Sequence, residues 1–187
     1  MAFVSHSNTE QLIDYWRSRG TPGSAPPRAS IDPSELTHVL PQIFILRRAA
    51  PRQFHFRLVG GLIADLHGRD LREEPFLKLW DEADRSSLSL ALEAARRQAE
   101  PLVVDCQART LDHGRLQLEM LLAPLMSADG EIDRLLGFYQ PLSPVTALAG
   151  RPLAALSLSH IRVMGSGRPM VPFPHLRLAT VDGRTVG

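Results

Sequence analysis

Cysteine and lysine are almost absent from this chain of 187 residues, which has one of each, Cys106 and Lys78. A single cysteine excludes an internal disulfide framework and a zinc site built from cysteine thiolates. Because Cys106 stands in an apolar run, we expect a buried and unreactive thiol. The other basic residues are all arginines, and their scatter along the chain favours codon usage over an anion-binding site.

An excess of charge of either sign is also missing, since 21 basic residues stand against 20 acidic ones and give a net charge of +1. No basic block is present, so we expect no nucleic-acid partner. No apolar run approaches the roughly 20 residues that cross a bilayer, and the first residues lack the charged and apolar regions of a signal peptide. The expectation is a cytoplasmic protein without a membrane partner.

Catalytic and metal-binding motifs are absent as well. The seven histidines form no HExxH pair, no GxSxG segment supports a hydrolase, and no glycine-rich phosphate loop occurs. Asp65, His67 and Asp70 lie close together in sequence, which leaves a small hydrolase-type enzyme as an alternative. We predict no catalytic residue, no metal site and a non-enzymatic function.

The clearest local pattern is a strand that leads into a short helix over a glycine pair. Phe54, Phe56 and Leu58 alternate with polar residues, which is the two-residue period of a half-buried strand. Gly60-Gly61 then breaks the strand, and Gly68 ends the helix that follows, because glycine adopts the left-handed conformation of a helix C-cap at little cost. Small-molecule pockets are often built over such corners.

The other elements follow from the same reasoning. They are a helix with an apolar stripe of Leu12, Tyr15 and Trp16, a strand over 43–46, a long helix over 83–99, and strands over 102–110, 116–123 and 132–139. Asp-Gly and Asp-His-Gly turn sequences separate the last three strands, as between antiparallel neighbours. This order predicts an α+β fold, a five-stranded and mostly antiparallel sheet with helices on one face.

Composition divides the chain into three parts. They are an N-terminal helix with a Pro/Gly loop over 1–30, a core over 31–141 and a proline-rich C-terminal extension over 142–187. Residues 153–163 and 175–181 are possible extra strands. We expect the extension to pack loosely, to add an edge to the sheet, or to meet a partner.

Five short segments together resemble a known family. They are Leu12-Ile13-Asp14-Tyr15-Trp16, the segment 27–33, the segment 40–44, Phe56-Arg57-Leu58-Val59-Gly60 and Gly68-Arg69-Asp70-Leu71. In this order and spacing, over about residues 8–140, they are similar to the single-domain PAS-like proteins of alphaproteobacteria. The resemblance implies that residues 31–141 form a PAS-like core. It also implies a sensory or protein-interaction module of bacterial signal transduction that acts through a signalling protein partner.

In the PAS layout, the inner face of the sheet and the short helices enclose a cavity that is mostly apolar. The side chains expected to line it are Phe44, Phe56, Leu58, Leu66, Trp80, Leu118 and Met120. They either bind a small apolar ligand or form a filled core, in which case the protein is purely a dimerisation scaffold. Arg57 either binds an anionic ligand at the mouth of the cavity or pairs with Asp32 or Asp70.

The resemblance also bears on cofactors and assembly. Haem is disfavoured because the long helix carries no histidine. Flavin photochemistry is disfavoured because its reactive cysteine would stand on the short helix, whereas Cys106 lies in a later strand. No cofactor is required. N-terminal helices of PAS proteins frequently form dimers, so we expect a homodimer through Leu12, Tyr15 and Trp16.

Overall fold

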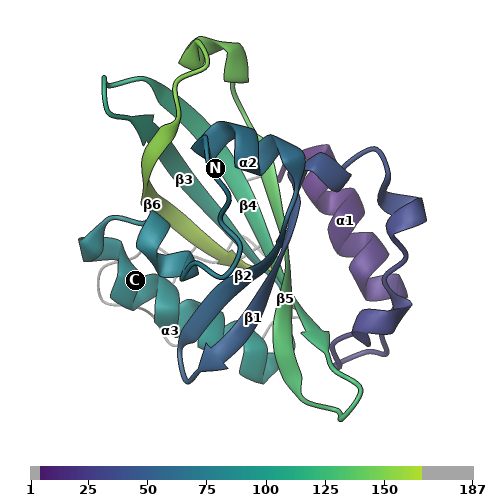
Figure 1. Ribbon diagram of the computed structural model, residues 1–187. Coiled ribbons are helices and arrows are strands. Elements are labelled where there is room, and N and C mark those ends of the chain that lie inside the picture. The colour runs from purple at the N-terminus through teal and green to yellow at the C-terminus, as the bar shows by residue number, and fades with distance from the viewer. Residues whose placement is uncertain (1–4, 166–187) are drawn as a thin grey trace, which may run out of the picture.

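A computed structural model of the chain describes residues 5–165 and contains one six-stranded sheet (Figure 1). The strands are β1 (Ile43–Ala50), β2 (Gln53–Val59), β3 (Leu102–Thr110), β4 (Arg115–Met126), β5 (Ile132–Pro141) and β6 (Leu153–Val163). They lie in the order β2-β1-β5-β4-β3-β6, and every neighbouring pair is antiparallel. The predicted α+β fold with an antiparallel sheet is therefore confirmed.

Three α-helices and five short 3-10 helices accompany the strands in residues 5–165. The α-helices are α1 (Ser7–Ser18), α2 (Gly61–His67) and α3 (Glu82–Gln98). The 3-10 helices are η1 (Arg28–Ser30), η2 (Pro33–Leu36), η3 (Leu40–Gln42), η4 (Phe76–Leu79) and η5 (Val145–Leu148). Within residues 5–165, no helix has the length and apolar character needed to cross a membrane.

The sheet has six strands where five were predicted. The additional strand is β6, which pairs with β3 along its whole length. Its apolar side chains Leu156 and Ile161 are fully buried, so the edge of β3 is closed by burial as well as by hydrogen bonds. This part of the C-terminal extension thus adds an edge to the sheet. The other possible strand, 175–181, lies outside the described residues.

The corner after β2 has the predicted form. A Cβ atom at Gly60 would lie 2.4 Å from the carbonyl oxygen of Pro41, so only glycine lets η3 approach the end of β2 this closely. α2 follows directly, and Gly68 ends it with a left-handed φ of 63°. These two glycines place α2 and η3 at one end of the sheet.

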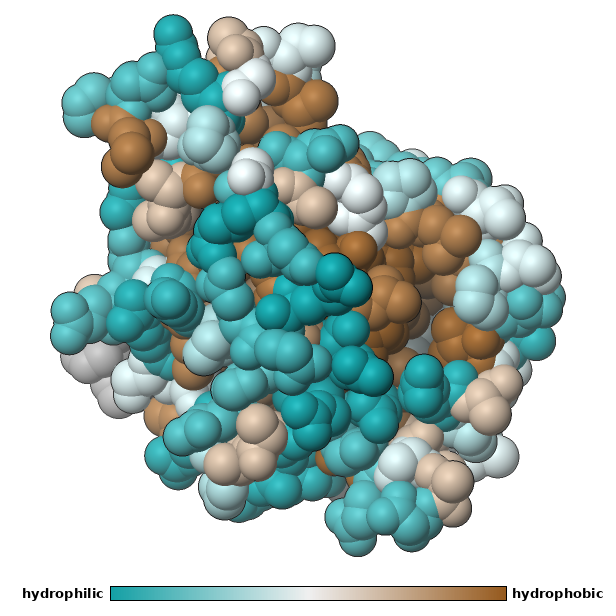
Figure 2. Space-filling view, viewed as in Figure 1, coloured by the Kyte–Doolittle hydropathy of each residue, from teal (hydrophilic) through white to brown (hydrophobic). Residues whose placement is uncertain are grey.

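Helices cover both faces of the sheet. On the inner face, α2, η4 and α3 contribute to one apolar cluster with side chains of all six strands. On the outer face α1 is buried through Leu12, Ile13 and Trp16, and Trp16 Nε1 donates a hydrogen bond of 2.7 Å to the carbonyl oxygen of Pro124 on β4. The one-sided arrangement predicted for the helices holds for α2, η4 and α3, whereas the apolar stripe of α1 and Leu36 of η2 are buried on the opposite face. Figure 2 shows a hollow with apolar atoms beside α1.

Candidate functional site

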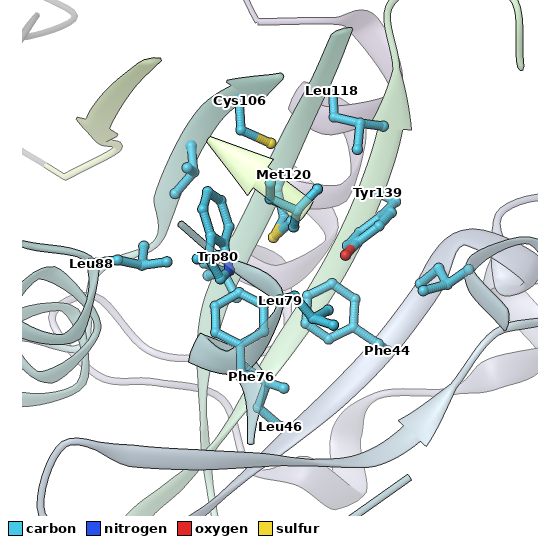
Figure 3. Packing of buried hydrophobic residues seen from close by; sticks show 14 of the residues in the cluster. Phe44, Leu46, Phe76, Leu79, Trp80, Leu88, Cys106, Leu118, Met120 and Tyr139 are labelled. Atoms are coloured by element: carbon cyan, nitrogen blue, oxygen red, sulfur yellow. The ribbon is translucent and has the colours of Figure 1, made fainter. Parts of the chain in front are cut away.

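The inner face of the sheet holds a cluster of buried aromatic side chains (Figure 3). Phe44 of β1 is its centre, with ring centroids 5.5 Å from Phe56, 6.0 Å from Phe76 and 5.5 Å from Tyr139. Trp80 joins the cluster through Phe76, at 5.8 Å between centroids. These are contact distances for aromatic pairs, and the rings are almost completely buried, so they pack against one another in the interior of the domain.

Six of the eight predicted ligand-site residues lie in this inner cluster. They are Phe44, Phe56, Leu66, Trp80, Leu118 and Met120. Strands β1, β2 and β4 supply four of them, α2 supplies Leu66, and Trp80 directly follows η4. The strand alternation and the α2 corner that predicted this grouping are therefore the features that build it.

The two remaining residues, Arg57 and Leu58, lie outside the cluster, contrary to prediction. The register between β1 and β2 passes from Ile45↔Leu58 to Leu46↔Phe56, so β2 carries one extra residue at this point. Such a β-bulge interrupts the two-residue alternation and re-aims the side chains that follow it. Leu58 is consequently 48% exposed and lines no interior space.

Arg57 pairs with neither of the two carboxylates that were predicted for it. Its Nη1 lies 3.4 Å from an oxygen of Glu73, in an exposed ion pair. Asp32 instead accepts a hydrogen bond from a backbone N–H at the start of η2, and Asp70 pairs with Arg72. Arg57 therefore belongs to the outer surface of the sheet and not to the mouth of an interior site.

Three polar groups interrupt the apolar interior. His67 Nε2 lies 3.3 Å from the hydroxyl of Tyr139, and both residues are buried. Trp80 Nε1 is buried and finds no hydrogen-bond partner among residues 5–165. Figure 3 shows this nitrogen and the hydroxyl of Tyr139 turned toward the interior, with Met120 between them. A buried donor without a partner costs free energy, so a ligand with an acceptor group gains most at this point.

Burial also determines the charge of these groups. It lowers the pKa of His67 to about 4, and the nearby Arg69 guanidinium acts in the same direction. It raises the pKa of Tyr139 well above its usual value. Both side chains are thus neutral at neutral pH, and the interior is suited to an uncharged ligand.

We expect His67 to make the free energy of unfolding fall as the pH is lowered from about 6.5 to 4. In the unfolded chain the imidazole takes up a proton below about pH 6.5, whereas in the folded chain it does so only near pH 4. The unfolded state binds more protons in this window, so the free energy of unfolding rises with pH through it and levels off above it. The expected loss at pH 4 is about 2–3 kcal/mol. Urea titrations at pH 7 and pH 4 measure it, and an equal loss in His67→Leu would contradict it.

The single cysteine has the predicted environment. Cys106 lies on β3 in the inner cluster, and burial raises the pKa of its thiol. The predicted buried position is therefore confirmed, and a thiol with a raised pKa is expected to be a poor nucleophile. No group of three His, Cys, Asp or Glu residues in the described ranges could hold a metal ion.

The three residues of the hydrolase alternative do not form one site. Asp65 and Asp70 are exposed, whereas His67 is buried and directed at Tyr139. Residues two positions apart on a helix point to different sides, which separates Asp65 from the imidazole. Neither Asp65 nor Asp70 therefore orients His67 as a base.

Sequence reasoning missed Tyr139 and the pairing of His67 with it. Both faces of β5 are buried from Leu135 to Gln140, so alternation does not reveal which side chains face inward. The one usable signal was chemical, since a tyrosine in an otherwise apolar strand needs a hydrogen-bond partner when buried.

Residues 4–140 match the PAS domain family. The chain belongs to that family. The matched residues run from α1 to β5, so β6 lies beyond the part of the chain that defines the family. No curated protein matches this PAS chain in sequence.

Solved structures with a similar fold include two LOV proteins and a receptor. The dark structure of the blue-light photoreceptor Aureochrome1 LOV is 14% identical, with a TM-score of 0.45 over 62% of this chain and 86% of that one. The LOV protein of Rhodobacter sphaeroides is 11% identical, with a TM-score of 0.46 over 63% and 72%. VqmA bound to DPO is 15% identical, with a TM-score of 0.45 over 63% and 59%. The PAS-like fold is consistent with a sensory or interaction module.

Proposed function

We propose that this PAS protein is a non-enzymatic sensory module of bacterial signal transduction whose interior binds a small, uncharged and mainly apolar molecule with one hydrogen-bond acceptor. The observation that supports the proposal is the indole N–H of Trp80, which is buried without a partner among residues 5–165. An acceptor on the ligand takes this N–H, while the remainder of the molecule contacts aromatic rings and the His67–Tyr139 pair.

The side chain best placed to make room for such a ligand is Met120. It lies between the nitrogen of Trp80 and the hydroxyl of Tyr139 (Figure 3). Methionine is unbranched and has three rotatable bonds, so it adapts to irregular space at low cost. The aromatic rings are in mutual contact, and a ligand therefore replaces the part of the interior that Met120 occupies.

Strand β4, which carries Met120, also connects the interior to the outer face of the sheet. Met120 follows Glu119 on β4, and successive side chains of a strand point to opposite faces. On the outer face, Glu119 Oε1 accepts a hydrogen bond of 3.0 Å from the backbone N–H of His6, at the start of α1. Displacement of Met120 by a ligand thus acts on the contact that holds α1, and a partner protein reads the change by contact.

Native mass spectrometry of the purified protein tests the proposal, with Trp80→Phe and Trp16→Phe compared with the wild type. Trp80→Phe removes the unpaired interior donor and keeps an aromatic ring. Trp16→Phe makes the same chemical change on the outer face, where the indole N–H bonds to Pro124. We expect a bound species of one defined mass in the wild type and in Trp16→Phe, and about tenfold less of it in Trp80→Phe, the effect of one lost hydrogen bond.

A wild-type protein without bound mass would favour the second candidate, a dimerisation scaffold with a filled core. The close ring contacts of Phe44 support this candidate. The homodimer itself stays a prediction. Leu12 and Trp16 are buried on the chain's own sheet, so of the three predicted interface residues only the half-buried Tyr15 is accessible to a second copy.

A further inference from the structure

Among the described residues, α1 contacts the outer face of the sheet at β4 and β5. The outer apolar cluster that contains α1 includes Ile43 of β1 but no residue of β2. Leu58 of β2 is 48% exposed, and Leu40 of η3, which adjoins the end of β2, is 37% exposed. Ile45 of β1 is only partly buried. Figure 2 shows a hollow with apolar atoms on this side of the molecule, between the positions of β2 and α1 in Figure 1.

The register of the strands arranges these side chains in a row. Ile45 stands opposite Leu58 on one side and opposite Leu136 on the other, so three neighbouring strands present an apolar residue at the same level. Leu58 belongs to this row because the bulge in β2 turns its side chain to the outer face. Large apolar side chains grouped on a surface mark interaction sites more often than single exposed ones do.

Two guanidinium groups border this row. Arg47 and Arg57 share the single carboxylate of Glu73, each with a nitrogen 3.4 Å from one of its oxygens. The three side chains are more than one-third exposed, so these ion pairs contribute little and leave a net positive charge. Arg47 also stands directly opposite Arg134 on β5, whose own carboxylate partner is Asp133, with Nε 3.7 Å from Oδ1. Like charges in opposed positions are unfavourable, so Arg134 gives Arg47 no compensation. Carboxylates brought by a partner would relieve this excess of positive charge.

We propose that this outer patch, Leu40, Ile45 and Leu58 with Arg47 and Arg57 at its border, binds an acidic amphipathic segment of a partner protein. Apolar side chains of the segment contact the row of Ile45 and Leu58. Its carboxylates pair with the two guanidinium groups, whose planar donors suit carboxylates in bidentate geometry. The patch is distinct from the interior site, because the sheet itself lies between them.

A surface of anionic lipid offers the same combination of apolar and negative groups. The shape of the surface favours a peptide, because a hollow with apolar atoms lies between β2 and α1 and a flat bilayer does not enter it (Figure 2). A single amphipathic segment fits between two elements of a protein surface and places apolar and acidic side chains on neighbouring sides.

Selection of random peptides displayed on phage tests the proposal, with the wild type as bait and Leu58→Asn for counter-selection. We expect the enriched peptides to combine apolar residues with Asp or Glu. A synthetic copy of the most enriched peptide is then titrated by fluorescence anisotropy. Leu58→Asn and Arg57→Gln are each expected to bind it about tenfold more weakly than the wild type.

Matched exposed positions serve as controls, namely Leu111→Asn, where the leucine is 89% exposed after β3, and Arg151→Gln, which breaks an exposed ion pair with Asp112. Both are expected to bind like the wild type. Equal binding by Leu58→Asn, enrichment of basic peptides, or no enrichment overturns the proposal. It is also overturned if Leu58→Asn abolishes binding to phosphatidylcholine vesicles with added phosphatidylserine, or dissociates a dimer seen by light scattering, because the patch would then serve a membrane or a second copy.

Discussion

Gly137→Ala is expected to lower the free energy of unfolding by about 4 kcal/mol, above the usual cost of an inserted methyl group. Gly137 on β5 stands directly opposite Phe44 on β1, and a Cβ atom there would lie 2.0 Å from Cζ of the ring. The ring is fully buried and in contact with Phe56, Phe76 and Tyr139, so it has no free side to move toward. Chemical denaturation of the purified variant measures the loss.

Two further variants decide whether the loss comes from the ring. Gly61→Ala adds a methyl group where no atom lies within 4 Å, at the start of α2, and is expected to be neutral or to stabilise by up to about 1 kcal/mol. Phe44→Leu in the Gly137→Ala background should recover part of the stability, which a double-mutant cycle reports. A loss below about 1 kcal/mol in Gly137→Ala would contradict the prediction. It would also mean that the ring moves easily and that the interior has room for a ligand without displacement of Met120.

Much of the secondary structure was predictable because its signals are local. β3 spans Leu102–Thr110, the range predicted from the sequence, and α3 ends within one residue of its expected end. Turn sequences and prolines mark the boundaries of these elements. Burial of one face of each element gives its apolar residues a regular spacing in the sequence. The α2 corner was predictable for the same reason, since two glycines specify its geometry through backbone sterics alone.

The face on which a residue lies was less predictable, because it depends on pairing between strands. The alternation of Phe54 and Phe56 continues in sequence to Leu58, but the bulge opposite β1 reverses the side. The sequence of β2 alone does not predict the bulge, because the bulge depends on the register between β1 and β2. The hydrogen bond between His67 and Tyr139 was unpredictable for a similar reason, because it joins residues that lie 72 positions apart in sequence.

The outer face also carries a buried ion-pair network that no sequence pattern indicated. Arg162 of β6 donates hydrogen bonds of 2.7 Å to Glu119 and to Asp105, on β4 and β3, and one of 2.8 Å to the hydroxyl of Ser5. The other oxygen of Glu119 accepts from the backbone N–H of His6, just before α1. The partners lie up to 157 residues apart in sequence, so only the folded sheet brings them together. The network links the start of α1 to three strands.

Arg162→Met is expected to lower the free energy of unfolding by about 3–5 kcal/mol, because it leaves the carboxylate of Glu119, a residue only 2% exposed, without its cation. Removal of both charges in Arg162→Met/Glu119→Leu should restore most of this loss, since a buried pair is often replaceable by apolar residues. Arg72→Met, which breaks an exposed pair, should cost less than about 1 kcal/mol.

Amide hydrogen exchange separates an effect on α1 from a general loss of stability. We expect Arg162→Met to speed exchange in α1 more than in β3 or β4, because the network joins the start of this helix to the sheet through Ser5 and His6. Equal acceleration in α1 and β4 would contradict that role. Arg162 stands on β6, beyond the residues that match the PAS family, whereas α1 lies within them. Faster exchange confined to α1 would therefore mean that a strand outside the family's matched region controls how firmly the N-terminal helix is held.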